Sequence, residues 1–415
     1  MKEREQFRFL WHSVAPHIRS GYGNVTRNLL TRFKQFGYNF TVSAYYGVEP
    51  GGVLLINDIP VLPSKFGTFG ETSCKYYYKA LKIKCAWLHT DPWAFQWFSR
   101  DLPCSASYGP LDHVDYPEEI QEMMRNYDYL VSPSKFQQKE WAKYGIEFEY
   151  IPHGVDVTTY YPIPKEQARK AMGLPEDIFI FGKVAANSDK ESRKSFVEEF
   201  RALQMFFDNN PDVKREYVKY FLFSNPSDGR GLQLELFIKK FGLQDVVITQ
   251  DPLLFQTGIK DSEMCLLYNC FDVLCSASRR EGFGLPIIEA QACGVPVIGA
   301  MFSSMPELIY GHGWLADVKT FIDTPINAVT AVIDPESIYK CMERAYFKDK
   351  ERKKYARLSR QFAIQFNWDD LVRDKWVPLL DKIIEEQSNL PGRQIAGISE
   401  EKDKLWEAKI REALR

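Results

Sequence analysis

The chain has 415 residues, which is too long for one ordinary hydrophobic core, so two domains are expected. Hydrophobic residues make up 45% of the chain and charged residues 26%, which indicates a globular protein and excludes disordered and fibrous classes. Lysine and arginine total 53 against 55 acidic residues. The net charge of -2 therefore provides no field that would gather nucleic acid or anionic lipid.

The cysteines and the N-terminal segment indicate in which cellular compartment the protein is expected. None of the eight cysteines belongs to a Cys-x-x-Cys pair, and several stand inside apolar runs such as FDVLCSAS, which is typical of buried free thiols in a reducing environment. The first residues, MKEREQFRFLW, contain no apolar stretch long enough for a signal peptide, and no window is long enough for a membrane helix. We therefore expect a cytoplasmic protein without a transmembrane segment.

Short β-branched or aromatic runs alternate with amphipathic helical patterns along the first half. This alternation predicts an α/β fold of doubly wound parallel sheets. The first strand is predicted at FRFLWHSV, followed by a glycine-containing loop and a helix at VTRNLLTRFKQF that ends at Gly37. Further strands are predicted at YNFTVSAYY, KIKCAWLH, YDYLVS and FEYIP.

A second βα series follows, with helices expected at KSFVEEFRALQMFF and GLQLELFIKKFG. Its strands are predicted at DIFIFGKVA, VKYFLFSN, DVVITQ, FDVLCSAS and VPVIGA. We expect two Rossmann-like domains, at residues 1–164 and 165–365, and a helical segment at 366–415. This last segment either packs back on the first domain or forms a solvated tail. Pro162 and Pro164 stiffen the crossing between domains and mark a hinge.

Open parallel sheets bind ligands beyond the carboxyl ends of their strands, so residues there are the first functional candidates. Gly21 and Gly23 follow the first strand, where a glycine loop before a helix favours phosphate or substrate contact. A tight turn capped by Asn24 explains the same loop equally well. His89 stands at another strand end and has either a functional role or a backbone partner, whereas Asp91 is expected to cap a helix.

Four basic residues follow the first strand of the second series, namely Lys183, Lys190, Arg193 and Lys194. A solvated loop explains many such clusters. A diphosphate leaving group, however, carries charge that a cation in this loop would neutralise as it departs. The stretch is therefore a candidate phosphate site.

The most specific stretch is REGFGLPIIEA, directly after the strand FDVLCSAS. Gly282 and Gly284 keep the backbone open, and a helix that begins near Leu285 points its positive end toward the same space. Glu281 lies in the loop and Glu289 about one turn inside the helix, so both carboxylates are expected to border one pocket. Amides for phosphate and carboxylates for hydroxyls suit a nucleotide-sugar. Alternatively, Glu289 satisfies backbone amides.

With these motifs, most of the chain resembles the family-4 retaining glycosyltransferases of the GT-B fold. Glu281 and Glu289 fit the family's Glu, seven residues, Glu motif. The resemblance implies that Glu281 meets the hydroxyls of the donor sugar and Glu289 the nucleotide ribose, with amides of Phe283, Gly284 and Leu285 on the diphosphate or sugar. Neighbouring segments that also fit are DSEMCLLYNCFDVLCSAS, SSMPELI, GHGWLADV, IDPESIYKCMERAYFKD and FNWDDLV.

The same resemblance assigns His89 to the donor sugar, and Gly21 to Gly23 to the phosphates or the acceptor. The segment PHGVD looks like the family's Asn-Gly-Val-Asp segment, with His153 in place of Asn. Lys183 stands where the family usually has arginine, and a lysine does not reproduce the guanidinium fork. The phosphate clamp is therefore expected to be Lys194 together with either Lys183 or Arg193.

These features predict a retaining glycosyltransferase that moves a sugar from a nucleoside-diphosphate sugar to an acceptor hydroxyl by front-face attack. We expect no metal and no cofactor beyond the nucleotide-sugar co-substrate, because no cluster has metal-ligand spacing and the resemblance implies none. The acceptor is a glycan, a lipid-linked sugar, a protein or a nucleic-acid base, among which the sequence does not choose. The alternatives are a sugar-nucleotide epimerase, a phosphorylase and a non-catalytic sugar-nucleotide-binding protein.

Overall fold

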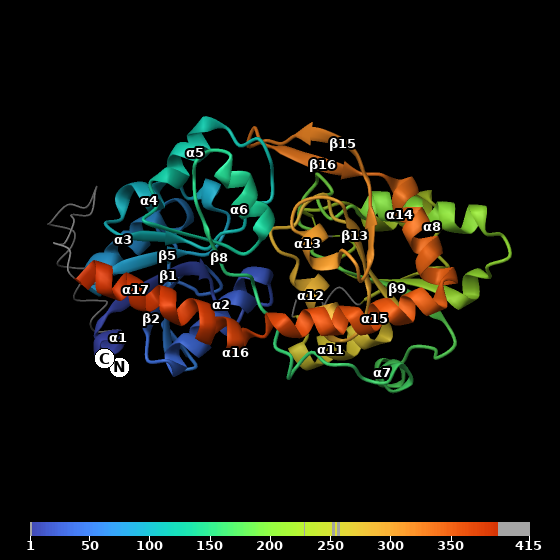
Figure 1. Cartoon of the computed structure of the whole chain (residues 1–415), viewed down its shortest axis with the longest axis horizontal. Helices are drawn as coiled ribbons and strands as arrows, with labels where there is room; N and C mark the ends of the chain where they lie inside the picture. The colour runs from blue at the N-terminus through green and yellow to red at the C-terminus, as the bar shows by residue number, and fades with distance from the viewer. Residues whose placement is uncertain (1, 228, 251–253, 255–257, 389–415) are drawn as a thin grey trace. The chain divides into compact units, whose positions relative to one another are not determined.

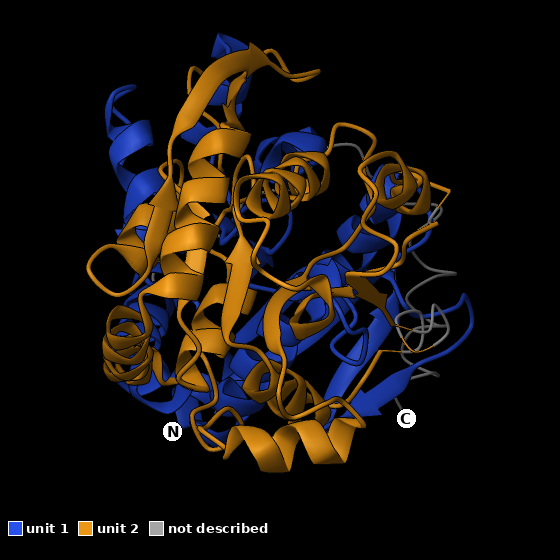
Figure 2. Ribbon diagram, turned by 90° about the vertical axis from the view of Figure 1, so that its right-hand side faces the viewer, with its two compact units in different colours: residues 1–111, 116–153, 368–415 blue, residues 112–115, 154–367 orange. Residues whose placement is uncertain are grey.

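The computed structural model describes residues 2–227, 229–250, 254 and 258–388. Contacts between residues divide the chain into two compact units, drawn in blue and orange in Figure 2. Unit 1 comprises residues 1–111, 116–153 and 368–415, and unit 2 comprises residues 112–115 and 154–367. We expected boundaries after residues 164 and 365. The observed boundary instead precedes Pro162 and Pro164, so the linker that contains both prolines belongs to unit 2.

Unit 1 is built on an eight-stranded sheet with the strand order β3-β4-β2-β1-β5-β6-β7-β8. Neighbouring strands run parallel, except that β3 and β4 pair antiparallel. All strands expected in this half are confirmed, whereas β3, β4 and β6 were not predicted, because short runs show little periodicity. The strands are β1 (Arg8–Val14), β2 (Asn39–Tyr46), β3 (Leu54–Ile56), β4 (Ile59–Pro63), β5 (Cys85–Leu88), β6 (Ser105–Ser107), β7 (Tyr129–Ser132) and β8 (Glu149–Tyr150).

The helices of unit 1 come from both ends of the chain. Near the C-terminus, the Trp376 ring lies 5.3 Å from Phe33 and 5.3 Å from Trp87, and the Tyr38 hydroxyl donates to the Val377 carbonyl at 3.0 Å. The described part of the expected C-terminal segment thus packs on unit 1, while its charged end lies outside the described residues. The helices are α1 (Lys2–Gln6), α2 (Gly21–Gln35), α3 (Glu71–Ala80), α4 (Gln96–Asp101), α5 (Glu118–Arg125), α6 (Lys135–Ala142), α16 (Trp368–Leu371) and α17 (Val377–Ser388), with short turns at Thr68–Gly70, Pro92–Ala94 and Val372–Trp376.

Unit 2 has a six-stranded parallel sheet with the order β11-β10-β9-β12-β13-β14, and a separate antiparallel hairpin of β15 and β16. The strands expected in this half are confirmed. The strands are β9 (Phe179–Val184), β10 (Val218–Phe223), β11 (Val247–Thr249), β12 (Val273–Ser276), β13 (Val297–Ala300), β14 (Trp314–Ala316), β15 (Val318–Asp323) and β16 (Val329–Ile333). The helices are α7 (Lys165–Met172), α8 (Phe196–Asn209), α9 (Leu234–Lys240), α11 (Asp261–Cys270), α12 (Leu285–Ala292), α13 (Met305–Ile309), α14 (Pro335–Phe347) and α15 (Asp349–Ala363), with turns at Arg215–Tyr217 and Ile364–Phe366.

Both sheets reverse their strand order at their first strand. In unit 1, β1 lies between β2 and β5 (Figure 1). In unit 2, β9 lies between β10 and β12. Doubly wound sheets bind ligands at this switch point, beyond the carboxyl ends of the strands. The loops after β1 and β5, and those after β9 and β12, are therefore the places to examine for a site.

The cysteines and the lengths of the helices bear on two expectations drawn from the sequence, namely free thiols and no transmembrane segment. All eight cysteines are free, and all except Cys341 are buried. The Sγ atoms of Cys265 and Cys293 lie 3.8 Å apart, a contact without a covalent bond. Within the described ranges, no helix is long and apolar enough to cross a membrane.

Candidate functional site

Two cations follow β9 on a strained backbone in unit 2. Arg193 and Lys194 lie just before α8, between Ser192 (φ 58°) and Ser195 (φ 52°), which both have a left-handed conformation. This conformation costs free energy for residues other than glycine. The Arg193 N–H also donates to the Asp189 carboxylate at 3.0 Å. The loop is thus held in one unusual shape that fixes where the two cations emerge.

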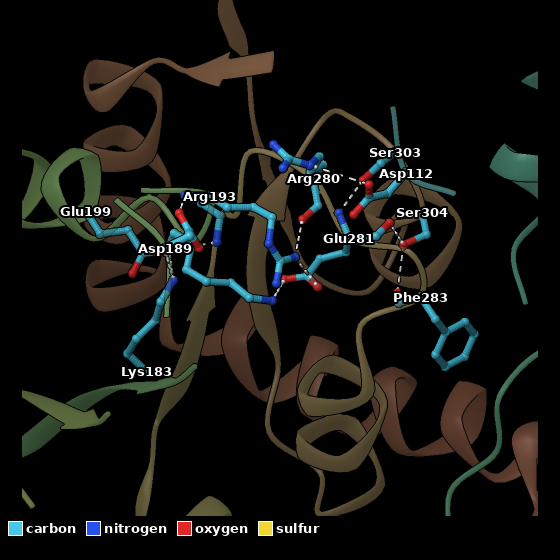
Figure 3. Close-up of polar contacts among 12 residues, drawn as sticks. Asp112, Lys183, Asp189, Arg193, Glu199, Arg280, Glu281, Phe283, Ser303 and Ser304 are labelled. Atoms are coloured by element: carbon cyan, nitrogen blue, oxygen red, sulfur yellow. Dashed lines mark hydrogen bonds and ion pairs between the residues drawn. The ribbon is translucent and has the colours of Figure 1, made fainter. Parts of the chain in front are cut away.

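Glu281, in the loop between β12 and α12, is the acid that faces these cations. Its carboxylate accepts a hydrogen bond of 2.6 Å from the Lys194 Nζ. The Arg193 Nη1 lies 3.8 Å from the other carboxylate oxygen and donates to the Arg280 carbonyl at 3.3 Å. Figure 3 shows the Arg193 side chain extending toward Glu281. The Lys194 and Glu281 side chains are only 13% and 10% exposed, so this ion pair is largely buried.

Burial governs the charges of this cluster. Burial and the Arg193 guanidinium lower the pKa of Lys194 to about 8, although Glu281 acts in the opposite direction. Burial also acts to raise the pKa of Glu281, but Lys194 and Arg193 outweigh it and hold this pKa below its usual value. At neutral pH the cluster therefore contains two cations and one carboxylate. An entering anion would meet both cations of this cluster.

Two serines that follow β13 fix the Glu281 loop. The Ser303 hydroxyl accepts a hydrogen bond from the Glu281 N–H at 2.9 Å. The Ser304 hydroxyl lies 2.8 Å from the Glu281 carbonyl and 2.7 Å from the Phe283 carbonyl. Both serines are buried, and they lie beside this loop in Figure 3. The loop backbone is thus held from the neighbouring strand.

The start of α12 lies at the end of the same loop. Gly284 precedes the helix with φ 105° and ψ 60°, and a Cβ atom there would lie 2.8 Å from the Ile287 side chain. Only glycine meets both conditions without strain. The first amides of a helix have no acceptor within the helix and lie at the positive end of its dipole. Backbone amides near Leu285 are therefore suited to an anion.

Glu289 lies on α12 and has a different partner from Glu281. Its carboxylate accepts a hydrogen bond of 2.8 Å from the Tyr268 hydroxyl on α11. Burial and the Glu289 carboxylate raise the pKa of Tyr268 well above its usual value, which keeps this hydroxyl protonated as a donor. The two glutamates are thus oriented separately, one by cations and the other by a neutral hydroxyl.

Asp112 is a charged member of unit 2 that the sequence did not indicate. Its carboxylate lies 3.5 Å from the Arg280 Nε and 3.1 Å from the His113 Nδ1. Burial acts to raise the pKa of Asp112, but His113, Arg280 and Arg193 hold it far below its usual value. No local pattern links this segment to the Glu281 loop, because the two are far apart in the sequence. Arg280, directly before Glu281, was the one available signal.

In unit 1, His89 follows β5 and is completely buried. Its Nδ1 lies 2.8 Å from the Tyr108 carbonyl, and its Nε2 has no hydrogen-bond partner among the described residues. Burial lowers the pKa of His89 to about 4, so the ring is neutral at pH 7. Since a carbonyl only accepts, Nδ1 carries the proton and Nε2 presents a lone pair. His89 thus has the backbone partner that was one of its two expected roles, and the functional role stays a prediction.

The glycines after β1 correct an expectation. The helix begins at Gly21, and Ser20 caps it by accepting a hydrogen bond from the Gly23 N–H at 3.2 Å, so the expected loop and Asn24 cap are wrong. A Cβ atom on Gly23 would lie 2.1 Å from the Ile18 carbonyl oxygen. Gly23 is therefore needed for close backbone packing, while Gly21 remains exposed in the first helical turn.

Comparison with known proteins assigns the segment around the unit 2 cluster. Residues 193–334 match the glycosyl transferases group 1 family, and they include Lys194, Glu281 and Glu289. Over this segment the chain is similar to the group 1 glycosyltransferases. The D-inositol 3-phosphate glycosyltransferase of Kineococcus radiotolerans is 24% identical over 281 residues, or 59% of this chain and 62% of that protein. The MMP alpha-(1->4)-mannosyltransferase of Mycolicibacterium hassiacum is 32% identical over 99 residues, or 24% of this chain and 22% of that protein.

Solved structures show the same fold over nearly the whole chain. A sucrose-phosphate synthase from Thermosynechococcus elongatus has a TM-score of 0.73 at 15% identity and covers 92% of this chain and 100% of that one. Anabaena HepE in complex with UDP-glucose has a TM-score of 0.65 at 16% identity, with coverages of 93% and 100%. The chain therefore has the GT-B fold, as the sequence predicted.

Lys183 was one of the two residues expected to accompany Lys194 at the phosphate. It lies on β9 itself and is 1% exposed, and its Nζ donates to the Glu199 carboxylate at 2.6 Å and to the Lys194 carbonyl at 2.8 Å. In Figure 3, Lys183 and Glu199 lie at one end of the cluster, away from the Glu281 loop. Arg193, rather than Lys183, accompanies the Lys194 ammonium.

Asp91 precedes the turn Pro92–Ala94, but its side chain makes no capping hydrogen bond. Asp91 therefore lies at the expected N-cap position, but its side chain does not cap the turn. His153 lies in unit 1, where its Nδ1 is 2.8 Å from the Tyr108 hydroxyl. No group of three or more His, Cys, Asp or Glu residues in the described part of the chain is arranged to hold a metal ion.

Proposed function

We propose that this protein transfers a sugar from a nucleoside-diphosphate sugar to an acceptor hydroxyl with retention at the anomeric carbon and without a metal. The observation that carries the proposal is the pairing of Arg193 and Lys194 with Glu281, beside the start of α12 at the switch point of unit 2. Two adjacent cations and helix amides suit a diphosphate, and the carboxylate suits a sugar hydroxyl.

Lys194 and Arg193 would act on the leaving group. When the bond between the anomeric carbon and the phosphate oxygen breaks, negative charge grows on the diphosphate. A preorganised cation in a water-poor site stabilises that charge more than it would in water. The acceptor oxygen forms its bond to the anomeric carbon on the same face, and its proton passes to an oxygen of the departing phosphate.

The carboxylates would hold the two ends of the donor. Glu281 would accept hydrogen bonds from hydroxyls of the transferred sugar, in exchange for part of its contact with Lys194. Glu289, whose partner Tyr268 orients it, would bind the ribose. Amides of Phe283, Gly284 and Leu285 would bind the diphosphate. The Phe283 ring is itself buried, which leaves its backbone as the ligand.

In unit 1, the unpartnered His89 Nε2 is an acceptor prepared for a substrate hydroxyl. Its low pKa keeps it neutral at pH 7, so it would orient a sugar hydroxyl rather than stabilise an anion. Gly21, in the first turn of α2, would offer a backbone amide to a phosphate or to the acceptor. The acceptor hydroxyl would come from a glycan, a lipid-linked sugar, a protein or a nucleic acid.

A panel of nucleotide-sugars tests this proposal. The true donor should raise the unfolding temperature, because a ligand that binds only the folded state stabilises it. With that donor and candidate acceptors, NMR of the product should show an unchanged anomeric configuration, and EDTA should leave the rate unchanged. Donor binding without any transfer would favour a non-catalytic binding protein. Inversion at the anomeric carbon, or loss of activity with EDTA, would contradict the mechanism.

A further inference from the structure

The loop between β4 and α3 holds an exposed aromatic ring in a strained conformation. Phe69 has φ 50° and ψ 36°, which lies in the left-handed region, and its side chain is 51% exposed. A bulky residue occupies this region only where its surroundings impose it, and such strain concentrates at functional sites. Folding alone does not require it, since an exposed ring contributes little to a core.

Hydrogen bonds to the carbonyls of Phe69 and of the next residue impose this conformation. Its carbonyl lies 3.0 Å from the Nε2 of His12, a fully buried residue whose Nδ1 lies 2.9 Å from the Ser43 hydroxyl. The Ser64 hydroxyl donates to the next carbonyl, that of Gly70, at 3.0 Å. The backbone is therefore anchored to β1 and β2 while the ring faces outward.

Two other aromatic rings contact the Phe69 ring. Its ring centroid lies 5.0 Å from that of Phe95 and 6.4 Å from that of Tyr45, at the end of β2. The Tyr45 hydroxyl is 2.9 Å from the Thr90 hydroxyl, directly after His89. We call Phe69 with its two supporting rings the aromatic platform. It adjoins the β5 end of the unit 1 switch point, where a substrate is expected.

Polar groups border the aromatic platform. The Thr90 and Tyr45 hydroxyls contact each other at its edge. Burial raises the pKa of Tyr45 to about 12, and the nearby Asp91 carboxylate adds to this rise. The hydroxyl is therefore a neutral donor at pH 7, and Asp91 supplies an anionic acceptor nearby. One exposed aromatic ring with polar groups close to it is the pattern of a polar small-molecule site rather than of a lipid surface.

We infer that the aromatic platform stacks against a pyranose ring of the acceptor, which makes the acceptor a saccharide. This inference rests on the proposed function, which requires an acceptor with a hydroxyl. A pyranose has a face of C–H bonds that matches the exposed Phe69 ring and an edge of hydroxyls that matches Tyr45 and Asp91. Stacking on Phe69 would hold the ring with a hydroxyl toward the end of β5.

The test measures saccharide binding to the full chain on an array of immobilised mono- and oligosaccharides, without any nucleotide. Phe69→Leu keeps the apolar volume but removes the flat face, and should weaken binding of the best saccharide by about tenfold. Phe69→Tyr keeps the face and should bind within about twofold of the parent. Phe66→Leu is the matched control, because Phe66 is also 51% exposed on this loop, and it should bind like the parent.

Phe69→Asn covers the case in which Phe69→Leu does not fold, since asparagine tolerates the left-handed conformation and has no ring. Thermal unfolding and nucleotide-sugar binding of every folded variant should match those of the parent. The inference is overturned if the parent binds no saccharide, if both ring-free variants bind normally, or if binding depends on an alkyl chain attached to the sugar. Failure of the proposed function would appear separately, as saccharide binding by a protein that transfers no sugar from any donor.

Discussion

Lys194 offers the sharpest test of the proposed leaving-group chemistry. We expect Lys194→Met to lower turnover by about a hundredfold or more, equivalent to about 2.7 kcal/mol of transition-state stabilisation. The variant keeps the aliphatic chain and loses only the cation. Because the charge on the diphosphate grows during the reaction, donor affinity should fall much less than turnover.

The magnitude follows from the geometry. A unit charge about 4 Å from another contributes roughly 4 kcal/mol at the effective dielectric constant of a partly exposed site. Only part of the diphosphate charge develops in the transition state, and Arg193, whose Nη1 is 3.8 Å from Glu281, remains as a second cation. Two to three kcal/mol, roughly, is therefore the share expected of Lys194. Stability should fall by about 1–2 kcal/mol, below the cost for a fully isolated buried charge, because Arg193 still faces Glu281.

The assay is release of nucleoside diphosphate from the donor that the thermal-shift panel identifies. Lys190→Met is the matched control, since Lys190 is an exposed lysine of the same loop and should tolerate the same change. Lys194→Arg keeps a charge and should recover part of the rate. If Lys194→Met turns over within about threefold of the parent while folding normally, the reasoning fails, and Arg193 becomes the candidate for the leaving group.

Three further outcomes are expected. Affinity for free nucleoside diphosphate, measured by calorimetry across pH, should fall as pH rises through about 8, since Lys194 is cationic below its pKa and neutral above it. Lys194→Arg should remove this fall in affinity, and a parent affinity that does not change with pH would contradict the assignment. Glu289→Gln should weaken nucleoside diphosphate binding while Glu281→Gln should chiefly lower turnover, and the reverse order would exchange their roles. Gly284→Ala should destabilise the protein to heat by about 1–3 kcal/mol, because of its φ of 105°; an unchanged melting temperature would show that the loop relaxes.

The strands and the Glu281 region were predictable because their signals are local. Buried parallel strands appear as apolar runs, and Glu281, Gly284 and Glu289 stand in one short stretch whose helix start is visible from its glycines and proline. The structure adds what holds each carboxylate, namely Lys194 for the first and the Tyr268 hydroxyl for the second. These partners come from other segments, which no local pattern connects.

Backbone strain was also invisible in the sequence. Neither Ser192 nor Ser195 is a residue type that announces a left-handed conformation, and Phe69 even argues against one. Tertiary hydrogen bonds impose these conformations, so only coordinates reveal them. The loop predicted at Gly21 and Gly23 was wrong for a different reason. These glycines resemble a phosphate-binding loop, but they lie inside a helix that Ser20 caps.

Lys183 shows how a basic residue near the end of a strand can be structural, and this interpretation can be tested. Its Nζ pairs with Glu199, which is 0% exposed and also accepts a hydrogen bond of 3.0 Å from the Ala277 N–H. Lys183→Met should therefore destabilise the fold by about 3–5 kcal/mol, as expected when one member of a buried ion pair is removed. Lys183→Met with Glu199→Gln should recover part of that loss, because no isolated carboxylate remains. Affinity for nucleoside diphosphate is then measured at a temperature where both variants are folded. If Lys183 is structural, both variants should bind within about threefold of the parent. If Lys183 is a phosphate ligand, both should bind more weakly, because Glu199→Gln does not restore the lost cation.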